Sequence, residues 1–194
     1  MGYIFCMMGK SASGKDTIYK RLLENPELPC KKIILYTTRP IRAGEKEGME
    51  YHFVTDDVLD EFDRKGKIIE MRAYQTVHGT WRYATVEDGQ IDLSGQSYLM
   101  IGTLEAFLRL KKYYGVNRIL PIYIEVEDGI RLQRALDRER EQSRPKYAEL
   151  CRRFLADEKD FSEERLADAN VTYRFSNQDI EKATKEIAAF IMNR

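Results

Sequence analysis

The chain has 194 residues, of which 43% are hydrophobic and 33% are charged, so it is long enough for one good core and is not a disordered chain. Lysine plus arginine and aspartate plus glutamate number 32 each, and this balance argues against a protein that coats nucleic acid. No apolar run approaches the ~18 residues that a membrane span needs, so we expect neither nucleic-acid nor membrane partners.

Strand-like and helix-like stretches alternate along the chain. Short apolar, β-rich runs predict strands at residues 3–8, 32–36, 51–54, 67–73, 80–84, 97–101, 119–126 and 171–175. Helical periodicity with start and stop signals predicts helices at residues 16–24, 56–65, 104–114, 128–141, 146–166 and 179–191. This alternation predicts a parallel sheet covered by helices on both faces, and the short strands between residues 37 and 95 look like an insertion into it.

A glycine-rich segment, G-K-S-A-S-G-K at residues 9–15, follows the first predicted strand and opens the first predicted helix. It matches the G-x-x-x-x-G-K pattern of a phosphate-binding loop. Glycines let backbone N–H groups converge on a phosphate, a helix N-terminus adds partial positive charge, and Lys15 supplies an ammonium group. An ordinary strand-to-helix turn with an incidental lysine is the alternative. We predict that ATP is bound by Gly9, Lys10, Ser11, Ala12, Ser13, Gly14, Lys15, Asp16 and Thr17.

Asp16 departs from the usual pattern, in which a serine or threonine places its hydroxyl on Mg²⁺. An aspartate in the first turn of a helix can serve structure alone, because its charge is favourable there. A carboxylate is also a good Mg²⁺ ligand, although it adds negative charge beside the nucleotide phosphates. Asp16 is therefore the candidate metal ligand, with direct contact, contact through water and a purely structural role all open.

The segment T-T-R-P-I-R-A-G-E at residues 37–45 contains two arginines three positions apart, Arg39 and Arg42, around a proline. Proline stiffens the backbone, and two guanidinium groups at a fixed spacing suit one phosphate dianion. Tyr51, a few residues later, can add a neutral donor. An exposed basic loop is the alternative, but it does not explain this ordered run of residue types.

These residues resemble the guanylate kinase family, in which a T-T-R-x-x-R-x-G-E segment followed by G-x-x-Y-x-F binds the phosphate of the acceptor GMP. The resemblance covers nearly the whole chain and implies an α/β, three-layer P-loop kinase fold with a parallel sheet, an inserted acceptor-binding segment and a lid. It implies a single domain, residues 1–194, with its core at 1–35, 96–137 and 154–194, the acceptor-binding segment at 36–95 and the lid at 138–153. It also implies a nucleoside monophosphate kinase that uses ATP and Mg²⁺ to convert GMP to GDP, as a monomer or homodimer.

The resemblance also implies which residues bind the two nucleotides. The acceptor is assigned to Arg39, Arg42, Tyr51, Glu70, Tyr83 and Thr85. In the family, the glutamate that matches Glu70 accepts hydrogen bonds from the guanine edge. The tyrosine that matches Tyr83 touches phosphate, and the hydroxyl that matches that of Thr85 faces the base. Asn177 lies in a segment that resembles the loop beside the donor adenine. Alternatively, Glu70 is a surface residue, Tyr83 only packs and Asn177 belongs to a turn before a helix cap.

Seven arginines fall between residues 131 and 153. Arginines on a lid that closes over the phosphates would neutralise the migrating charge and exclude water. By resemblance, the catalytic residues are Lys15, Arg134, Arg138 and Arg153, with Arg152 a near-equal candidate for the last position. A solvated helix face with ion pairs would explain some of the same arginines.

The base-reading half of the site departs from the family pattern. Met100 and Gly102 stand where guanylate kinases usually have an aspartate pair, and Leu35 stands where they often have a serine near the guanine. A kinase for another nucleoside monophosphate or for a small phosphorylated metabolite is therefore an alternative. A non-catalytic guanylate-kinase-like binding module is a second, against which the intact Lys15 speaks.

The cysteines and histidines suggest no metal cluster. Cys6, Cys30 and Cys151 are odd in number and widely spaced, so we expect reduced thiols and a cytoplasmic location. His52 and His78 lie apart from each other and from the cysteines.

Overall fold

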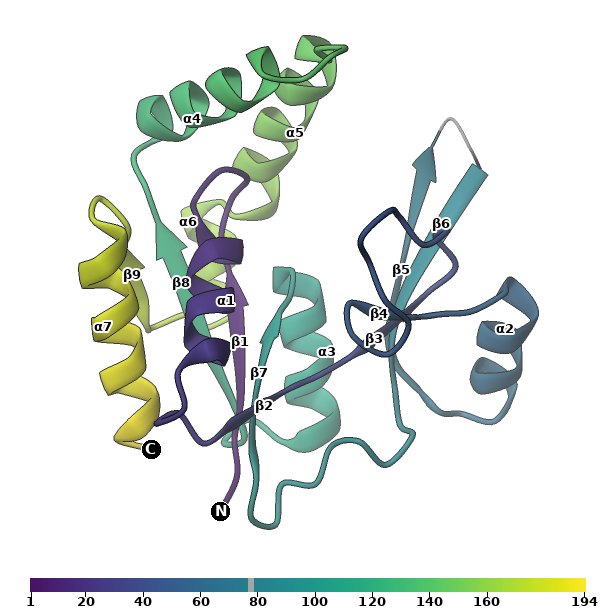
Figure 1. Cartoon of the computed structure of the whole chain (residues 1–194). Coiled ribbons are helices and arrows are strands. Elements are labelled where there is room, and N and C mark those ends of the chain that lie inside the picture. The colour runs from purple at the N-terminus through teal and green to yellow at the C-terminus, as the bar shows by residue number, and fades with distance from the viewer. Residues whose placement is uncertain (77–78) are drawn as a thin grey trace.

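The computed structural model describes residues 1–76 and 79–194, and it contains a five-stranded sheet between helices with a four-stranded sheet beside it (Figure 1). His78, which the sequence argues is no metal ligand, lies outside the described residues. Among the described helices, none combines the length and the apolar character needed to cross a bilayer.

The five-stranded sheet is wholly parallel. Its strands in spatial order are β2 (Cys30–Lys32), β7 (Ser97–Ile101), β1 (Ile4–Met8), β8 (Ile119–Glu125) and β9 (Arg174–Ser176). β1 is central and every residue in it is buried, because helices cover both faces of a parallel sheet. Phe5 and Met7 point into one core cluster, whereas Ile4, Cys6 and Met8 point into the other.

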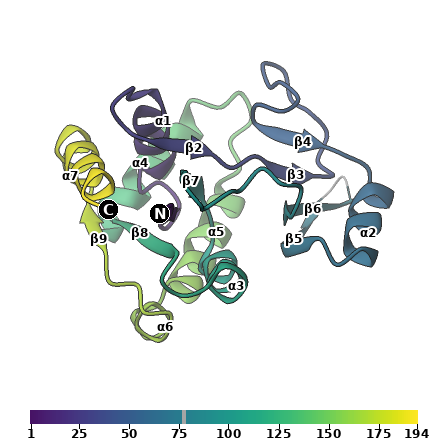
Figure 2. The ribbon, with the colours of Figure 1, turned by 90° about the horizontal axis from the view of Figure 1, so that it is seen from below.

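Two groups of helices supply the outer layers (Figure 2). On one side α1 (Lys15–Glu24) and α7 (Ile180–Met192) bury apolar residues such as Ile18 and Ile187 against the sheet. On the other side α3 (Leu104–Tyr114) and α6 (Glu163–Asp168) do the same with residues such as Phe107 and Leu166. The sheet is therefore the middle of three layers, as predicted.

The second sheet gathers the short strands. Its strands in spatial order are β4 (Tyr51–Phe53), β3 (Leu35–Thr37), β6 (Gly79–Val86) and β5 (Ile68–Thr76). One face packs on α2 (Asp56–Arg64) through Leu59 and Ala84. A register shift between Ile68 and Glu70 puts a β-bulge in β5, and such bulges re-aim side chains.

Two helices leave the core beside the loop between β1 and α1. α4 (Asp128–Arg140) follows β8, and α5 (Tyr147–Asp160) packs against it on the way back to the core. Figure 1 shows this pair above the β1–α1 loop, at the end of the parallel sheet where β1 and β8 terminate. Ligands of parallel α/β sheets bind at this carboxyl end.

The structure corrects two predicted elements. The strand expected at residues 32–36 is wrong, because β2 ends at Lys32 in one sheet and β3 begins at Leu35 in the other. The helix expected at residues 146–166 is also wrong. It is interrupted after α5, where the hydroxyl of Ser162 accepts a hydrogen bond from the N–H of Arg165 and starts α6 as an N-cap.

Candidate active site

The loop between β1 and α1 exposes the N-terminus of α1. Gly14 precedes α1 with φ 84°, a left-handed conformation, and a Cβ there would lie 2.3 Å from Nδ2 of Asn177. Only glycine satisfies both conditions without strain. Among the described residues no side chain caps the first N–H groups of α1, which leaves those of Lys15 and Asp16 to bind an anion.

Asn177 supports this loop from behind. It is 1% exposed, and its Nδ2 donates to the carbonyl oxygen of Ser13 at 2.7 Å. In the described part of the chain its Oδ1 and the hydroxyl of Ser13 lack hydrogen-bond partners. This predicted ATP-binding residue is thus packed against the backbone of Ser13 and Gly14.

Lys15 and Asp16 occupy the first turn of α1. The Lys15 Nζ lies 3.8 Å from Oδ2 of Asp16, and the side chains are 19% and 76% exposed. Thr17, one residue on, is also exposed. A carboxylate and a hydroxyl therefore face solvent beside the phosphate loop.

A cluster of charged residues around the buried Arg131 ties the first half of the loop to α4 and α5. Arg131 of α4 is 1% exposed; its Nη1 donates to the carbonyl of Ser11 at 3.0 Å, and its Nη2 donates to Glu158 at 2.8 Å. Asp157 accepts from the Ser11 N–H at 2.7 Å, and the Lys10 Nζ donates to Glu158 at 2.7 Å. The loop backbone is therefore held from both sides, and the Lys10 side chain is committed to α5.

The same arginine has a carboxylate partner within its own helix. Nε and Nη2 of Arg131 both donate to Oδ1 of Asp128, at 3.0 and 2.6 Å. Although burial alone would raise it, the pKa of Asp128 is lowered by Arg131 and by the nearby Lys10. The guanidinium also lies 4.7 Å from the ring centroid of Phe154 on α5, which adds a cation–π contact.

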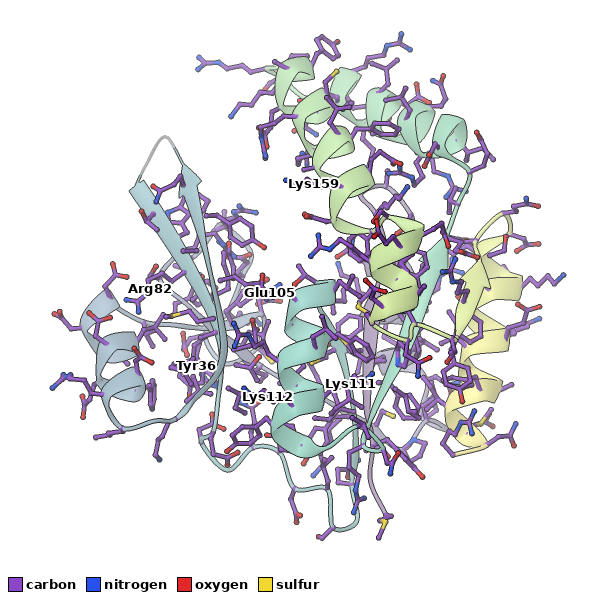
Figure 3. The ribbon with its side chains drawn as sticks, turned by 180° about the vertical axis from the view of Figure 1, so that it is seen from behind. Tyr36, Arg82, Glu105, Lys111, Lys112 and Lys159 are labelled. Carbon is purple, nitrogen blue, oxygen red and sulfur yellow. The ribbon has the colours of Figure 1, made fainter. Side chains whose placement is uncertain are left out.

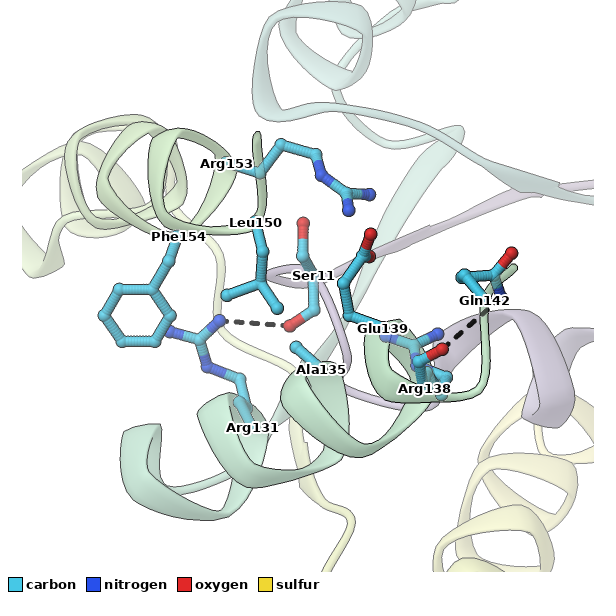
Figure 4. Close-up of a pocket in the computed structure, with 9 residues that line it drawn as sticks. All are labelled: Ser11, Arg131, Ala135, Arg138, Glu139, Gln142, Leu150, Arg153 and Phe154. Carbon is cyan, nitrogen blue, oxygen red and sulfur yellow. Dashed lines mark hydrogen bonds between the residues drawn. The ribbon is translucent and has the colours of Figure 1, made fainter. Parts of the chain in front are cut away.

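A hollow of about 200 Å³ lies between α4 and α5, with Ser11 of the loop in its lining (Figure 4). Two of the predicted catalytic arginines, Arg138 and Arg153, line it from the two helices. Arg134 does not line it, since its Nη2 donates to the carbonyl of Asn177 at 3.2 Å. The guanidinium of Arg152 donates two hydrogen bonds of 2.7 Å to Glu149. This pairing favours Arg153 over Arg152 as the candidate catalytic arginine.

The predicted acceptor-phosphate arginines differ in their surroundings. Arg39 is 3% exposed and donates to both carboxylate oxygens of Glu45, at 2.8 and 3.0 Å. These hydrogen bonds raise the pKa of Arg39 and lower that of Glu45. Glu45 also accepts from the backbone N–H of Arg42, whose side chain is exposed and forms no ion pair with any described residue. One guanidinium is thus fixed and the other is available.

The other acceptor residues share one face of the second sheet. Tyr51 and Tyr83 lie with ring centroids 5.6 Å apart, and the Arg39 guanidinium is 5.4 Å from the Tyr51 ring. Glu70 on β5 pairs with Thr85 on β6, and the Thr85 hydroxyl donates to its Oε1 at 3.0 Å. Glu70 is 4% exposed, so it is not the surface residue of the alternative interpretation, and its burial raises its pKa.

The sequence did not identify the residues that hold the site together. Asp157 and Glu158 contact the phosphate loop from 146 and 148 residues away, and no local pattern indicates such pairs. Arg131 had a local signal, since Asp128 precedes it by three residues at the start of a helix. Arg72 also had one, because it follows Glu70 by two positions and so shares its face of β5.

Comparisons with known proteins point to one family. Residues 3–194 match the family model described as guanylate kinase. A guanylate kinase of Tropheryma whipplei is 30% identical over 182 residues, which cover 92% of this chain and 87% of that protein. One from Aliivibrio fischeri is 31% identical over 93 residues, 45% of each chain. The crystal structure of guanylate kinase from Anaplasma phagocytophilum superposes with a TM-score of 0.67 at 24% identity, covering 99% of this chain and 85% of that one, which shows the predicted fold.

Proposed function

The chain belongs to the guanylate kinase family and is therefore a nucleoside monophosphate kinase that converts GMP to GDP with ATP and Mg²⁺, and from this premise we propose which residues carry the reaction. The observation that supports the assignment most is the uncapped N-terminus of α1 behind Gly14, next to the partly buried Lys15. It favours catalysis over a non-catalytic binding module, because it is a site for the phosphates of a nucleotide.

The phosphate loop would hold the donor, and Lys15 would carry positive charge to the phosphoryl group in transit. Phosphoryl transfer depends mainly on positioning and on neutralising charge, and the acceptor phosphate is already a nucleophile. A general base is therefore unnecessary. Arg138 and Arg153, which line the hollow beside Ser11, would add positive charge from α4 and α5. Arg134 would act nearer to Asn177, where its guanidinium now donates.

The acceptor phosphate would bind at the loop after β3. Arg42 is free of ion pairs within the described chain, and Arg39 is held in place by Glu45 beside Tyr51 and Tyr83. Glu70 would accept hydrogen bonds from the guanine base. Leu35 lies on the same sheet face as Tyr51 and Thr85. Its side chain is apolar, so it cannot form a hydrogen bond with the base.

The first turn of α1 fits a magnesium ion shared with a nucleotide. Mg²⁺ is usually bound through one or two carboxylates, substrate phosphates and water, not in an all-protein cage. Asp16 offers one exposed carboxylate and Thr17 one hydroxyl, and the described residues contain no cluster of three metal-binding side chains. Asp16 would hold the ion directly or through water, and the ion would shield the donor phosphates.

The cellular setting of this reaction is part of the proposal. The described cysteines Cys6, Cys30 and Cys151 are all free thiols, which suits a reducing cytoplasm. The zero net charge supports small-molecule nucleotides as partners in preference to nucleic acid or a membrane surface. The enzyme would act as a monomer or homodimer.

Coupled measurement of ADP release over a panel of monophosphates tests the function. We expect release with ATP, Mg²⁺ and GMP, and at least tenfold lower kcat/KM with AMP, CMP or UMP, which is about 1.4 kcal/mol of discrimination. Release with CMP or UMP but not GMP would reassign the acceptor. Silence with every monophosphate, from a protein that still binds ATP, would favour a binding module.

A further inference from the structure

Arg72 is a largely buried cation beside the predicted base-reading carboxylate. It lies on β5 directly across from Tyr83 of β6, and its side chain is 14% exposed. Its Nε is 3.3 Å from Oε2 of Glu70, yet that buried N–H has no hydrogen-bond partner in the described part of the chain. A buried donor without an acceptor is costly, and its presence calls for an explanation.

One oxygen of the neighbouring Glu70 carboxylate already accepts a hydrogen bond. Glu70 has a side chain 2% exposed, with Oε1 accepting from Thr85 and Oε2 facing Arg72. The pair therefore presents acceptor and donor groups side by side on one sheet face. Figure 3 shows Glu105, at the start of α3, on the side of α3 that faces this sheet, and Glu105 is close enough to raise the pKa of Glu70 further.

The end of β7 lacks the carboxylate that the family pattern has there. Burial raises the pKa of Cys6 to about 12, and the positive charge of Arg72 opposes that shift. A Cβ on Gly102 would lie 2.7 Å from the Cys6 sulfur, so these positions are adjacent. The charge of Arg72 therefore acts on a thiol that lies beside Gly102, the position where the family pattern has an acid.

We propose that Arg72 is a specificity-determining residue that donates hydrogen bonds to O6 and N7 of the acceptor guanine, while Glu70 accepts from N1 and N2. Guanine presents two acceptors on the edge that contains O6 and N7, and arginine binds them in the commonest specific contact to that base. Adenine would keep the N7 acceptor but place its amino group against Arg72 in the position of O6, and it would present an acceptor nitrogen to Glu70 in the position of the guanine N1–H, so each contact would gain a repulsive element. The inference rests on the proposed function.

The base, not the phosphate, is the ligand that this position suits. A phosphate dianion next to Glu70 would meet a buried carboxylate, whereas Arg39 and Arg42 offer positive charge in the loop after β3. A planar base edge needs both an acceptor and a donor, which Glu70 and Arg72 supply together. Arg72 would thus supply the hydrogen bonds to the base that Leu35 and Gly102 cannot make.

The test compares GMP with 7-deaza-GMP, which lacks N7, in the wild-type enzyme and in Arg72→Met. We expect Arg72→Met to lower kcat/KM for GMP about ten- to hundredfold, the range of one bidentate contact. We expect wild type to discriminate against 7-deaza-GMP and Arg72→Met to use both acceptors equally well. Arg72→Lys, with one ammonium in place of the planar fork, should fall between them.

Arg82→Met is the matched control. Arg82 lies on the opposite face of the same sheet, paired with Asp60 at 2.7 Å and Asp56 at 3.2 Å on α2 (Figure 3), so the ratio of the two acceptors should stay at the wild-type value. An unchanged ratio in Arg72→Met, or in Arg72→Lys if the methionine variant does not fold, would overturn the inference while leaving the kinase assignment intact. Failure of wild type to use any monophosphate would overturn the proposed function itself.

Discussion

The two lysines of the phosphate loop, Lys10 and Lys15, differ in how tightly their ammonium groups are paired. Lys10 donates to both carboxylate oxygens of Glu158, at 2.7 and 2.8 Å, whereas the ion pair of Lys15 within the described chain is a loose 3.8 Å contact with its neighbour Asp16. A tight pair across 148 residues holds structure together. A loosely held ammonium at a helix N-terminus is available to a ligand.

This contrast predicts opposite outcomes for the same substitution. Lys15→Met should lower kcat about 100- to 1,000-fold, the loss typical of one preorganised electrostatic contact, with the melting temperature nearly unchanged. Lys10→Met should lower the melting temperature because Glu158 loses a partner. Steady-state kinetics and thermal melts on both variants check this, and full activity in Lys15→Met would contradict the catalytic role.

Glu70 predicts a pH dependence of stability. Burial raises its folded-state pKa above the unfolded value, so the folded protein holds a proton that the unfolded chain releases as the pH rises. The stability contributed by this group is therefore present below the unfolded pKa and lost as the pH rises through the folded one. Glu70→Gln, which cannot ionise, should melt higher than wild type at neutral pH, and the difference should vanish near pH 4, about the unfolded value.

The same substitution, Glu70→Gln, should lower activity with GMP while it raises stability at neutral pH. Glu70→Gln should use GMP less well, because the amide replaces one of two acceptor oxygens needed by the guanine edge. Thr85 can still donate to the remaining carbonyl oxygen, so the sheet need not rearrange. Thermal melts across pH with a GMP titration of activity would test both parts. A variant that melts below wild type at neutral pH would contradict the buried-carboxylate argument.

Between elements, Arg131 is the link that joins the phosphate loop to α4 and α5. It touches Ser11, Asp128 and Glu158 through hydrogen bonds and Phe154 through its ring. Removing one member of a fully buried ion pair costs about 3–5 kcal/mol. The loss of Arg131 should cost less than this, because Asp128 and Glu158 are 48% and 37% exposed and stay hydrated. An exposed pair on the same helix, Arg140 with Asp137 at 3.5 Å, contributes about 0–1 kcal/mol.

Urea unfolding of Arg131→Met and Arg140→Met should reproduce that difference. Arg131→Met should also raise the KM for ATP, because Ser11 loses the donor that fixes its carbonyl and the loop becomes less ordered. Arg140→Met should leave the KM for ATP unchanged. Equal unfolding midpoints for the two variants would show that the buried network adds no net stability.

The elements that the sequence predicted well are those whose burial follows from local composition. β1 and β7 are continuous apolar runs because both faces of the parallel sheet are covered, and their predicted bounds hold within one residue. The loop of residues 9–15 was equally clear, since all the residues of its G-x-x-x-x-G-K pattern are consecutive in the sequence. The strand at residues 32–36 failed because an unbroken apolar run hides the passage from one sheet to another.

The contacts that the sequence did not predict join residues far apart in the chain. The sequence predicts Asn177 as an ATP-site residue, but it does not predict that its amide packs behind Gly14 and bonds to Ser13, 164 residues away. Asp157 and Glu158 fall within the helix predicted at residues 146–166 without any functional signal, and only the path of α5 past the phosphate loop makes them partners of Ser11 and Lys10. Local periodicity contains no information on such contacts.

At the scale of the whole molecule, the two proposed nucleotide sites lie on different parts of the chain. The proposed donor site is at the end of the parallel sheet under α4 and α5, and the proposed acceptor residues belong to the second sheet beside it and to the loop after β3 (Figure 1). A ligand that occupies both sites at once stabilises the folded state through both sets of contacts while losing its translational freedom only once.

An adenosine and a guanosine joined through a polyphosphate chain should therefore raise the melting temperature more than ATP or GMP at the same concentration. Arg39→Ala should remove most of that advantage while keeping the response to ATP, because it weakens only the acceptor end. Thermal melts of both proteins with each ligand make the comparison. If the joined ligand protected wild type no better than ATP, the donor and acceptor phosphates would not lie end to end, and transfer between them would be ruled out.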